Sequence, residues 1–284
     1  MTKVSINLSS YNHAKYLREA IDSVLNQTFS DYQLFIEDDT STDESWFIIK
    51  SYTDPRIRSF RNSKNRNDLE GMRKVIFQMA TGEYIAIHHS DDIWEPEKLQ
   101  KQVDFLDAHP QFGAVFTNAK IIDEDGKRLK DKSHFYYKIF DQPNRDRFEW
   151  LNFFFYQGNA LCHPSVLIRK SCYNECGFYR DGLNQLGDFD MWVRLCLKYE
   201  IHVIPEKLVR FRVRSNEMNT SGNRPETRIR WQFEMLQVLE NFQKIPTYQE
   251  LVKIFPAAQK YYRQDGCDIR YVLSLLALET TNDN

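Results

Sequence analysis

Several sequence signatures of well-known protein classes are missing from this chain. It has no G-x-G-x-x-G turn, no G-x-x-x-x-G-K-[ST] loop and no G-x-S-x-G segment. Dinucleotide-dependent hydride transfer, P-loop phosphate binding and serine-hydrolase chemistry therefore have no motif here to support them. No run of 18 or more apolar residues is present either, so we expect no helix that spans a bilayer.

Cysteines are few, and neither sign of charge dominates. The closest two of the five cysteines, Cys172 and Cys176, do not have the spacing of a zinc or redox pair. Reduced structural thiols in a cytosolic protein are expected. The first residues lack the basic head and apolar core of a secretory signal, which agrees with a cytoplasmic location. A formal net charge of −2 gives no global basic field, so nucleic acid is not an expected partner.

What the sequence does contain is an alternation of strand and helix patterns. Its 284 residues, 42% of them hydrophobic, are enough for one large domain with an appendage. Apolar strand patterns cover residues 4–10, 32–39, 57–62, 83–88 and 112–122, and helical patterns cover residues 13–28, 42–52, 68–82 and 95–106. This order predicts an α/β fold with a mostly parallel central sheet flanked by helices.

The second half of the chain is less regular. Residues 127–160 show no clear period, residues 163–170 return to a strand and residues 188–199 predict a helix. Residues 201–215 predict two strands around Pro205. The composition changes after residue 222, and residues 226–278 predict helices with an apolar stripe of Trp231, Met235, Leu236 and Leu239. We therefore expect a domain over residues 1–222 and a helical C-terminal appendage over residues 223–284.

Acidic residues end two of the predicted strands. Glu37, Asp38 and Asp39 follow one strand, and Asp91 and Asp92 follow another. Ligands of open α/β sheets bind at the carboxyl ends of the strands, where the two acidic groups would meet in one crevice.

Adjacent carboxylates at positions 91 and 92 repel each other unless a cation lies nearby. A divalent metal ion held by a carboxylate, water and substrate phosphate oxygens would supply it. A solvated turn in which an aspartate caps the next helix is the alternative. His88 and His89 should face opposite sides of their strand, and each of them, like His163, is either a metal ligand or a hydrogen-bonded structural histidine.

Two further groups of charged residues remain ambiguous from the sequence. Asp188 and Asp190 begin a predicted helix, so one can cap it while the other reaches the crevice and accepts a proton from an attacking hydroxyl. Arg210, Arg212 and Arg214 recur with a period of two, which fits either binding of a pyrophosphate or cross-strand pairing with acids. Arg73, in the helix before the strand that ends at Asp91, is undecided in the same way.

Four segments, taken in order, resemble glycosyltransferase family 2. They are VSINLSSYN, LREAIDSVLNQTFSDYQLFIEDDTSTDES, ATGEYIAIHHSDDIWEPEKLQKQVDFL and GDFDMWVRL, within residues 3 to 215. SSYN corresponds to a Thr/Ser-x-Tyr-Asn segment of the family, and EDDTSTDES to its Asp-Asp-Gly-Ser-x-Asp segment. The resemblance implies the GT-A fold, a Rossmann-like α/β architecture, and an inverting transfer of sugar from a nucleotide-sugar donor.

The resemblance also implies a role for individual residues. The nucleotide base would be held by Ser9, Tyr11, Asp39 and Arg73. Within this group Asp39 would accept a hydrogen bond from a uracil ring nitrogen, and Tyr11 would stack on the ring.

The same resemblance assigns the chemistry to aspartates. Asp91 would contact the ribose or the sugar, and Asp92 would bind Mn²⁺ or Mg²⁺ as the last acid of the Asp-x-Asp motif of the family. Asp188 would be the catalytic base, and Asp190 a structural or acceptor-side residue. Metal and arginines would neutralise the leaving diphosphate.

The sequence departs from the family pattern at two places. Thr40 stands where the family has Gly, and Phe211-Arg212-Val213-Arg214 stands where many members have Tyr-Arg-x-His. A histidine metal ligand is therefore not expected there. Arg212 and Arg214 are expected at the donor instead, with Arg214 in direct contact with the diphosphate, a role that a fixed cation can fill.

Two other functions are alternatives to this assignment. A sugar-nucleotide pyrophosphorylase would need a Gly-rich, basic loop after the first strand, which SSYNHAK does not provide. A non-catalytic nucleotide- or glycan-binding module would have no use for Asp188 beyond helix capping. The expected acceptor is a glycan or a lipid-linked glycan, as in the synthesis of bacterial polysaccharides. The C-terminal helices could contact the inner face of a membrane, form a homodimer or lid, or only pack on the core.

Overall fold

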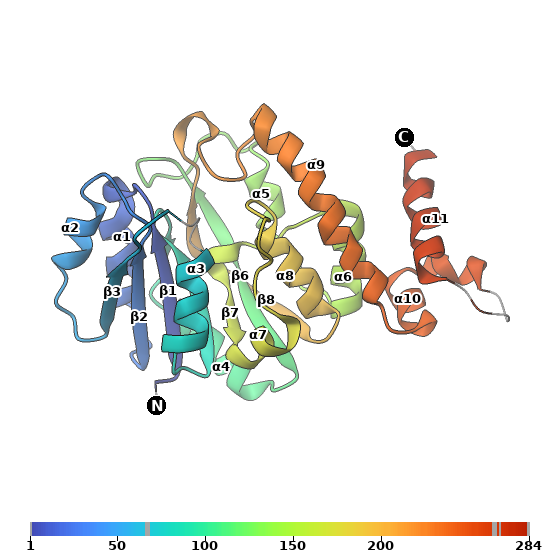
Figure 1. The fold of residues 1–284 in the computed structure, drawn as a ribbon, viewed down its shortest axis with the longest axis horizontal. Coiled ribbons are helices and arrows are strands. Elements are labelled where there is room, and N and C mark those ends of the chain that lie inside the picture. The colour runs from blue at the N-terminus through green and yellow to red at the C-terminus, as the bar shows by residue number, and fades with distance from the viewer. Residues whose placement is uncertain (1, 66–68, 263–265, 267, 283–284) are drawn as a thin grey trace.

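An eight-stranded sheet forms the centre of the molecule in the computed structural model, which describes residues 2–65, 69–262, 266 and 268–282. The strand order is β3-β2-β1-β4-β7-β6-β8-β5. β1 pairs in parallel with β2 and β4, and β2 pairs in parallel with β3. β6 and β8 are also parallel, whereas β7 and β5 run antiparallel to their neighbours. The sheet is therefore mixed and mostly parallel, as the sequence predicted (Figure 1).

The strands have the following bounds. They are β1 (Val4–Ser10), β2 (Tyr32–Asp38), β3 (Ile57–Arg61), β4 (Tyr84–His89), β5 (Ile93–Trp94), β6 (Phe112–Ile122), β7 (Leu167–Arg169) and β8 (Glu200–Arg212). The carboxyl ends of β1, β2 and β4 lie at one edge of the sheet because these strands pair in parallel and in register.

Helices cover both faces of the sheet. The α-helices before residue 200 are α1 (Ala14–Leu25), α2 (Ser45–Lys50), α3 (Leu69–Lys74), α4 (Lys98–Ala108), α5 (Tyr136–Ile139), α6 (Arg147–Gln157), α7 (Lys170–Cys176) and α8 (Gly187–Cys196). A π-helix, η1 (Val75–Met79), continues α3, and η2 (His163–Ser165) is a 3₁₀ turn before β7.

Side-chain alternation along β4 divides the core into two layers. Tyr84 and Ala86 face a cluster that includes residues of α1 and α4, whereas Ile85 and Ile87 face a cluster that includes residues of η1, α6 and α8. This alternation is the period-two pattern of a strand buried on both faces. The fold is thus a three-layer α/β/α arrangement.

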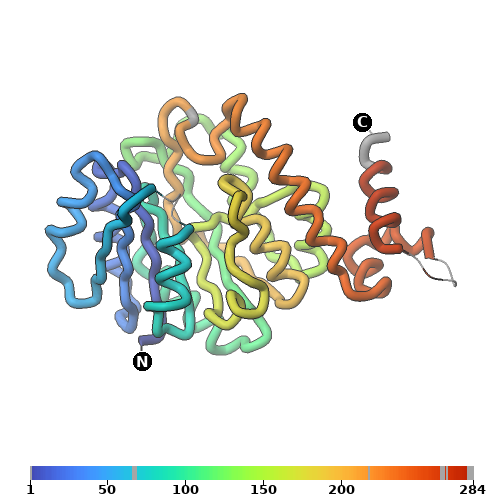
Figure 2. Tube along the Cα trace, in the orientation of Figure 1, coloured from blue at the N-terminus to red at the C-terminus, as the bar shows by residue number. Residues whose placement is uncertain are grey.

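The C-terminal helices continue the second of these layers. They are η3 (Ser215–Glu217), α9 (Pro225–Leu239), η4 (Glu240–Lys244), α10 (Tyr248–Ile254), η5 (Pro256–Tyr261) and α11 (Ile269–Asn282). Met235, Val238 and Phe242 share one apolar cluster with Trp150 of α6 and Trp192 of α8. Figures 1 and 2 show α9 running alongside the domain and α10 and α11 at its far end.

Three expectations about the second half of the chain were wrong in whole or in part. Residues 201–215 do not form two strands, because β8 continues through Pro205, where its register with β6 shifts. The irregular segment contains α6, whose Asp146 and Glu149 form a capping box. The predicted stripe of α9 is only partly its buried face, since Met235 and Leu239 pack in the core whereas Trp231 and Leu236 are 42% and 67% exposed.

The four described cysteines are free thiols, and Cys267 lies outside the described residues. Within the part of the chain that the structure describes, every helix is too short or too polar to cross a membrane.

Candidate functional site

A cavity of about 990 Å³ opens at the carboxyl ends of β1 and β4. It extends to the start of α8 and to the segment that follows β8. Six of the nine residues predicted from the sequence line it, namely Ser9, Tyr11, Asp39, Asp91, Asp188 and Arg214. Arg73, Asp92 and Arg212 are not among the lining residues. The crevice expected from the strand ends is therefore present.

The β1 and β2 side of the cavity presents one aromatic ring and one buried carboxylate. Tyr11 is 43% exposed, and Asp39 is 1% exposed. Asn62, which follows β3, donates from Nδ2 to Asp39 Oδ1 at 2.9 Å and to Glu37 Oε1 at 2.6 Å. Ser9 donates to the other oxygen of Glu37 at 3.5 Å. The exposed Tyr11 ring can stack on a planar base. The fixed carboxylate oxygens beside it can accept hydrogen bonds from the N–H groups of that base.

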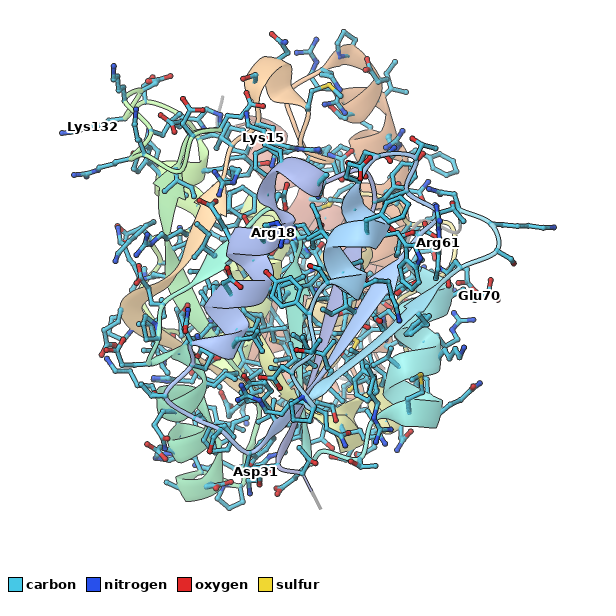
Figure 3. All side chains as sticks on the ribbon, turned by 90° about the vertical axis from the view of Figure 1, so that its left-hand side faces the viewer. Lys15, Arg18, Asp31, Arg61, Glu70 and Lys132 are labelled. Carbon is cyan, nitrogen blue, oxygen red and sulfur yellow. The ribbon has the colours of Figure 1, made fainter. Side chains whose placement is uncertain are left out.

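The loop after β2 has an unusual backbone at Thr40. Its φ is +63°, in the left-handed region that glycine occupies freely and that β-branched residues rarely enter. Asp38 accepts at Oδ2 from the backbone N–H of Ser41, and Arg61 pairs with the same oxygen at 2.9 Å. Arg61 is labelled in Figure 3 at the end of β3. These contacts hold the loop around Thr40 in this shape.

His89, Asp91 and Asp92 form a cluster that can hold a metal ion. One ligand atom from each lies within 4.8 Å of the others. Asp92 Oδ1 accepts from the backbone N–H of Arg212 at 2.8 Å, whereas its buried Oδ2 has no hydrogen-bond partner and lies 3.6 Å from His89 Nδ1. Burial and the adjacent Asp91 carboxylate raise the pKa of Asp92 well above its usual range. An unpartnered buried oxygen beside a second carboxylate and an imidazole fits a hard divalent cation.

A chain of side chains orients His89. Its Nε2 lies 3.2 Å from His163 Nδ1, and His163 Nε2 lies 3.0 Å from the hydroxyl of Tyr179. If Nε2 of His89 donates along this chain, its Nδ1 keeps a lone pair facing Asp92. Metal-binding histidines use their second ring nitrogen in the same way. His88, in contrast, is fully buried beside Trp94 and Ser23 and is a structural residue.

Arg212 supports the acidic loop from behind instead of lining the cavity. It is 1% exposed, and its guanidinium donates to the carbonyl of Asp91 at 2.7 Å, the carbonyl of Glu124 at 3.0 Å and a carboxylate oxygen of Glu19 at 2.7 Å. All three contacts lie within the protein. Arg210, two residues earlier, pairs with Glu95 of the neighbouring segment at 2.9 Å. The sequence left two alternatives for this arginine series, pyrophosphate binding and pairing with acids. Arg210 shows the second, pairing with an acid.

Arg214 does line the cavity. Its Nη1 donates to His13 Nε2 at 2.8 Å, its Nη2 donates to the carbonyl of Met218, and its buried Nε has no hydrogen-bond partner. The Nε lies 3.6 Å from Asp91 Oδ2. His13 Nδ1 faces Ser90 Oγ at 2.8 Å. The guanidinium is thus held rigidly next to the acidic cluster, with one donor atom unused.

Arg73 is not brought to this group. It pairs with Asp181 at 2.9 Å on the surface, and its guanidinium lies over the ring of Phe178.

Asp188 lines the same cavity as Asp91 of the acidic cluster. Its Oδ2 accepts from Asn159 Nδ2 at 3.1 Å, and its Oδ1 accepts from the backbone N–H of Phe189 at 2.7 Å. Burial raises the pKa of Asp188 to about 6 against the opposing effect of these bonds. A carboxylate with such a pKa can accept a proton near neutral pH. Asp190, in contrast, is fully buried and bound by Arg194 at 2.7 Å, so its role is structural.

Sequence reasoning missed His13, Asn159 and Glu234. His13 follows the SSYN segment directly and could have been noticed for that reason. Asn159 and Glu234 give no local signal, because their partners are Asp188 and the backbone of residues 184–186.

Residues 5–169 match the sequence profile described as Glycosyl transferase family 2. An uncharacterized glycosyltransferase of Methanocaldococcus jannaschii is 29% identical over 215 residues, which cover 74% of this chain and 70% of that protein. WfaP of Escherichia coli, a UDP-Glc:alpha-D-GlcNAc-diphosphoundecaprenol beta-1,3-glucosyltransferase, is 34% identical over 112 residues, or 39% of this chain and 44% of that enzyme.

Solved structures share the fold. TarS of S. aureus, as residues 1–349 in complex with UDP, superposes with a TM-score of 0.65 at 17% identity, covering 89% of this chain and 69% of that one. The mannosyltransferase PcManGT of Pyrobaculum calidifontis, in complex with GDP-Man and Mn²⁺, gives 0.61 at 16% identity, with coverages of 98% and 80%. At these identities the similarity concerns the fold.

Proposed function

This chain belongs to glycosyltransferase family 2, and we propose that it transfers a sugar from a UDP-sugar to an acceptor hydroxyl with inversion at the anomeric carbon. Family membership makes it a glycosyltransferase that uses nucleotide-sugar donors, which decides against a binding module and a pyrophosphorylase. The observation that carries the finer proposal is that Asp91, Arg214 and Asp188 line one and the same cavity. This arrangement suits in-line displacement of a diphosphate by an alcohol.

Asp188 acts as the base in the proposed reaction. Its carboxylate takes the proton of the acceptor hydroxyl while the hydroxyl oxygen forms a bond to the anomeric carbon. The bond from that carbon to the diphosphate oxygen breaks, and its electron pair leaves with the nucleoside diphosphate. One displacement of this kind inverts the configuration. Asn159 and the N–H of Phe189 keep the carboxylate oriented through the bonds described above.

Arg214 and the acidic cluster receive the diphosphate. Nε of Arg214 is the unused donor that we assign to a diphosphate oxygen. His89, Asp91 and Asp92 would hold Mn²⁺ or Mg²⁺, an extension of the sequence prediction, which named Asp92. When bound, the ion withdraws charge from the leaving phosphate oxygens. Arg212 fixes the loop through the carbonyl of Asp91 and the carboxylate of Asp92.

The β1 and β2 side of the cavity is the proposed site of the nucleotide base. Tyr11 is proposed to stack on uracil, with Asp39 accepting from the ring N–H and Ser9 beside them, and UDP donors are named for WfaP. The acceptor of WfaP carries a lipid diphosphate. We propose a glycan or lipid-linked glycan of bacterial polysaccharide or glycoconjugate synthesis as acceptor, with the protein in the cytoplasm or at the inner face of the membrane.

A donor screen tests the proposal. Purified protein is mixed with UDP-, dTDP- and GDP-sugars, with Mn²⁺ or with EDTA, and its melting temperature and slow donor hydrolysis are recorded. UDP-sugars with Mn²⁺ should raise the melting temperature and should be hydrolysed. The Asp188→Asn variant should bind the same donor without turning it over. Hydrolysis at the wild-type rate by this variant would remove Asp188 from the reaction, and a preference for another base would refute the UDP assignment.

A further inference from the structure

Glu234 of α9 binds the loop that leads to Asp188. The side chain is buried, and its carboxylate accepts three consecutive backbone N–H groups. Asn184 donates to Oε1 at 3.0 Å, and Gln185 and Leu186 donate to Oε2 at 2.9 and 2.7 Å. Three charge-assisted bonds on one buried carboxylate fix both the position and the direction of a loop. The bound loop ends two residues before Asp188.

Asn241 of η4 binds the other side of the same segment. It is fully buried, and its Nδ2 donates to Asp190 Oδ1 at 2.7 Å. The second oxygen of Asp190 accepts from Arg194 Nε at 2.8 Å. Asp188 therefore lies between two attachment points, and both attachments come from the C-terminal helices.

We propose that Glu234 and Asn241 form a clasp that positions Asp188, so that the C-terminal helices are a working part of the active site. The proposal rests on the function proposed above, in which Asp188 is the base. Glu234 and Asn241 are positioning residues, because neither is among the residues that line the cavity.

The same helix also forms part of the cavity wall. Arg230 and Trp231, one turn before Glu234, line the cavity together with Gln185 and Asp188. α9 therefore holds the wall residues and the base loop in one rigid element. A sugar transfer needs its base within hydrogen-bond reach of the acceptor hydroxyl, and small displacements of such a group are costly.

The clasp has an electrostatic consequence at Asp188. Burial is the main reason why the pKa of Asp188 is raised, and the negative charge of Glu234 raises it further. Tyr179, in the loop before α8, and Cys162, after α6, are also in electrostatic contact with Asp188. Arg230 of α9 and Arg214 line the same cavity. Removing the charge of Glu234 should therefore lower the apparent pKa of the base.

Three variants test the clasp in the full-length protein. Glu234→Ala removes the acceptor for three N–H groups, Glu234→Gln removes the charge and keeps one carbonyl oxygen, and Asn241→Ala removes the bond to Asp190. Glu226→Gln is the matched control, because Glu226 is an exposed acid at the start of the same helix. Each is measured by hydrogen exchange of the peptide that contains residues 184–188 and by donor turnover across pH.

In Glu234→Ala we expect at least tenfold faster exchange at residues 184–186 and a 10- to 100-fold lower kcat, with the donor KM within a factor of two. In Glu234→Gln the acid limb of the kcat profile should move to lower pH, which loss of packing alone would not produce. Asn241→Ala should lower kcat without raising KM. The control should match the wild type throughout.

Unchanged exchange in Glu234→Ala would overturn the clasp, and so would faster exchange with unchanged kcat and pH profile. If that variant does not fold, Glu234→Gln and Asn241→Ala decide between the same outcomes. The Asp188→Asn variant separates this failure from failure of the proposed function. Wild-type turnover in Asp188→Asn would refute Asp188 as the base, whereas the exchange measurement reports the clasp in either case.

Discussion

Asn159 donates from Nδ2 to Oδ2 of Asp188 over 3.1 Å. The carboxylate belongs to the first turn of α8, and the amide belongs to the segment after α6, so this bond joins that segment to α8. A hydrogen bond to a carboxylate favours its charged form, whereas burial disfavours it. For Asp188 burial has the larger effect and raises the pKa to about 6.

The pH dependence of turnover follows from this balance. A base with a raised pKa is protonated, and inactive, at pH values below that pKa. We expect kcat of the wild type to fall about tenfold per pH unit below about pH 6. In Asn159→Ala the acid limb should move to higher pH, because the bond that favours the charged form is lost. Asp188→Asn should lower kcat by roughly 10²- to 10⁴-fold at pH values above the pKa of Asp188, and the acid limb that reports this base should disappear.

Initial rates at saturating donor between pH 4.5 and 8.5 give the acid limb of the kcat profile for the wild type and for each variant. Asn152, which bonds the carbonyl of Ile254, provides the control through Asn152→Ala. An acid limb that stays in place in Asn159→Ala would show that this bond does not set the protonation of the base.

Removal of Arg214 tests its assignment to the diphosphate. Arg214→Ala should lower kcat/KM for the donor by about 10²-fold, since a fixed donor aimed at developing charge is worth about 2.7–4 kcal/mol in the transition state. Binding of UDP, measured by titration calorimetry, should weaken as well. Arg228→Ala, which removes an exposed arginine bonded to Asn223, should change neither quantity. Full turnover in Arg214→Ala would refute the assignment.

Substitution of Arg212 and Arg210 compares a buried arginine with a partly exposed one on the same strand. Arg212→Met should destabilise the protein by about 2–4 kcal/mol, because it leaves the carbonyl of Asp91 in the acidic loop and the carbonyl of Glu124 after β6 without this donor. It should also weaken Mn²⁺ binding, which electron paramagnetic resonance can measure. Arg210→Met should cost less, about 1 kcal/mol, since the Arg210 guanidinium is partly exposed to solvent and Glu95 keeps Lys120 as a second partner. Equal melting temperatures for the two variants would contradict this.

The strands, and the meeting of the acidic residues at one edge of the sheet, could be predicted because both follow from the pattern of residues close together in the sequence. β1 covers the same residues as the predicted strand, and Asp39 and Asp91 follow strand ends that must meet at one edge. The role of Arg212 could not be predicted, because its acceptor on Asp91 lies 121 residues away and is a backbone atom. Glu234 bonds Leu186 across 48 residues for the same kind of reason. Side chains that bind backbone leave no pattern in their partners.

The helix α6 could not be predicted from the sequence for a different reason. Its apolar residues surround most of the helix, so no period separates a buried face from an exposed one. The capping box of Asp146 and Glu149 was visible in the sequence and would have placed its start.

Thr40→Gly should stabilise the protein. Thr40 has a φ of +63°, and a left-handed backbone costs a residue with a Cβ roughly 1–2 kcal/mol. The greater freedom of glycine in the unfolded chain offsets roughly 0.5–1 kcal/mol of this gain. We expect a net gain of about 1 kcal/mol or less, measured by urea unfolding, with the donor KM unchanged.

The control is Thr28→Gly, at an exposed threonine outside the left-handed region. This variant should be less stable than the wild type. A loss of stability in Thr40→Gly as well would mean that the Thr40 hydroxyl contact to the carbonyl of Asp39 outweighs the backbone strain.

Lys98 is a lysine that the fold keeps fully buried. Its Nζ donates to Gln102 Oε1 at 2.8 Å and lies 3.8 Å from the centre of the Trp94 ring. Burial lowers the pKa of Lys98 well below its ordinary value. The unfolded chain therefore takes up a proton at this side chain across a pH range in which the folded chain does not. The free energy of unfolding is lowered in that range, and the penalty disappears only when the pH rises above the unfolded pKa.

Lys98→Met should remove this penalty, because methionine has a similar length and no charge to desolvate. We expect the variant to be more stable by about 1–3 kcal/mol at pH 7 and to lose part of the rise in stability that the wild type shows between pH 7 and 10. Urea unfolding at several pH values measures both effects. Lys101→Met serves as the control, because Lys101 pairs with Glu206 at the surface and should contribute little. A Lys98→Met variant that is less stable than the wild type at pH 7 would show that the contacts of the amine with Gln102 and Trp94 outweigh the cost of burying it.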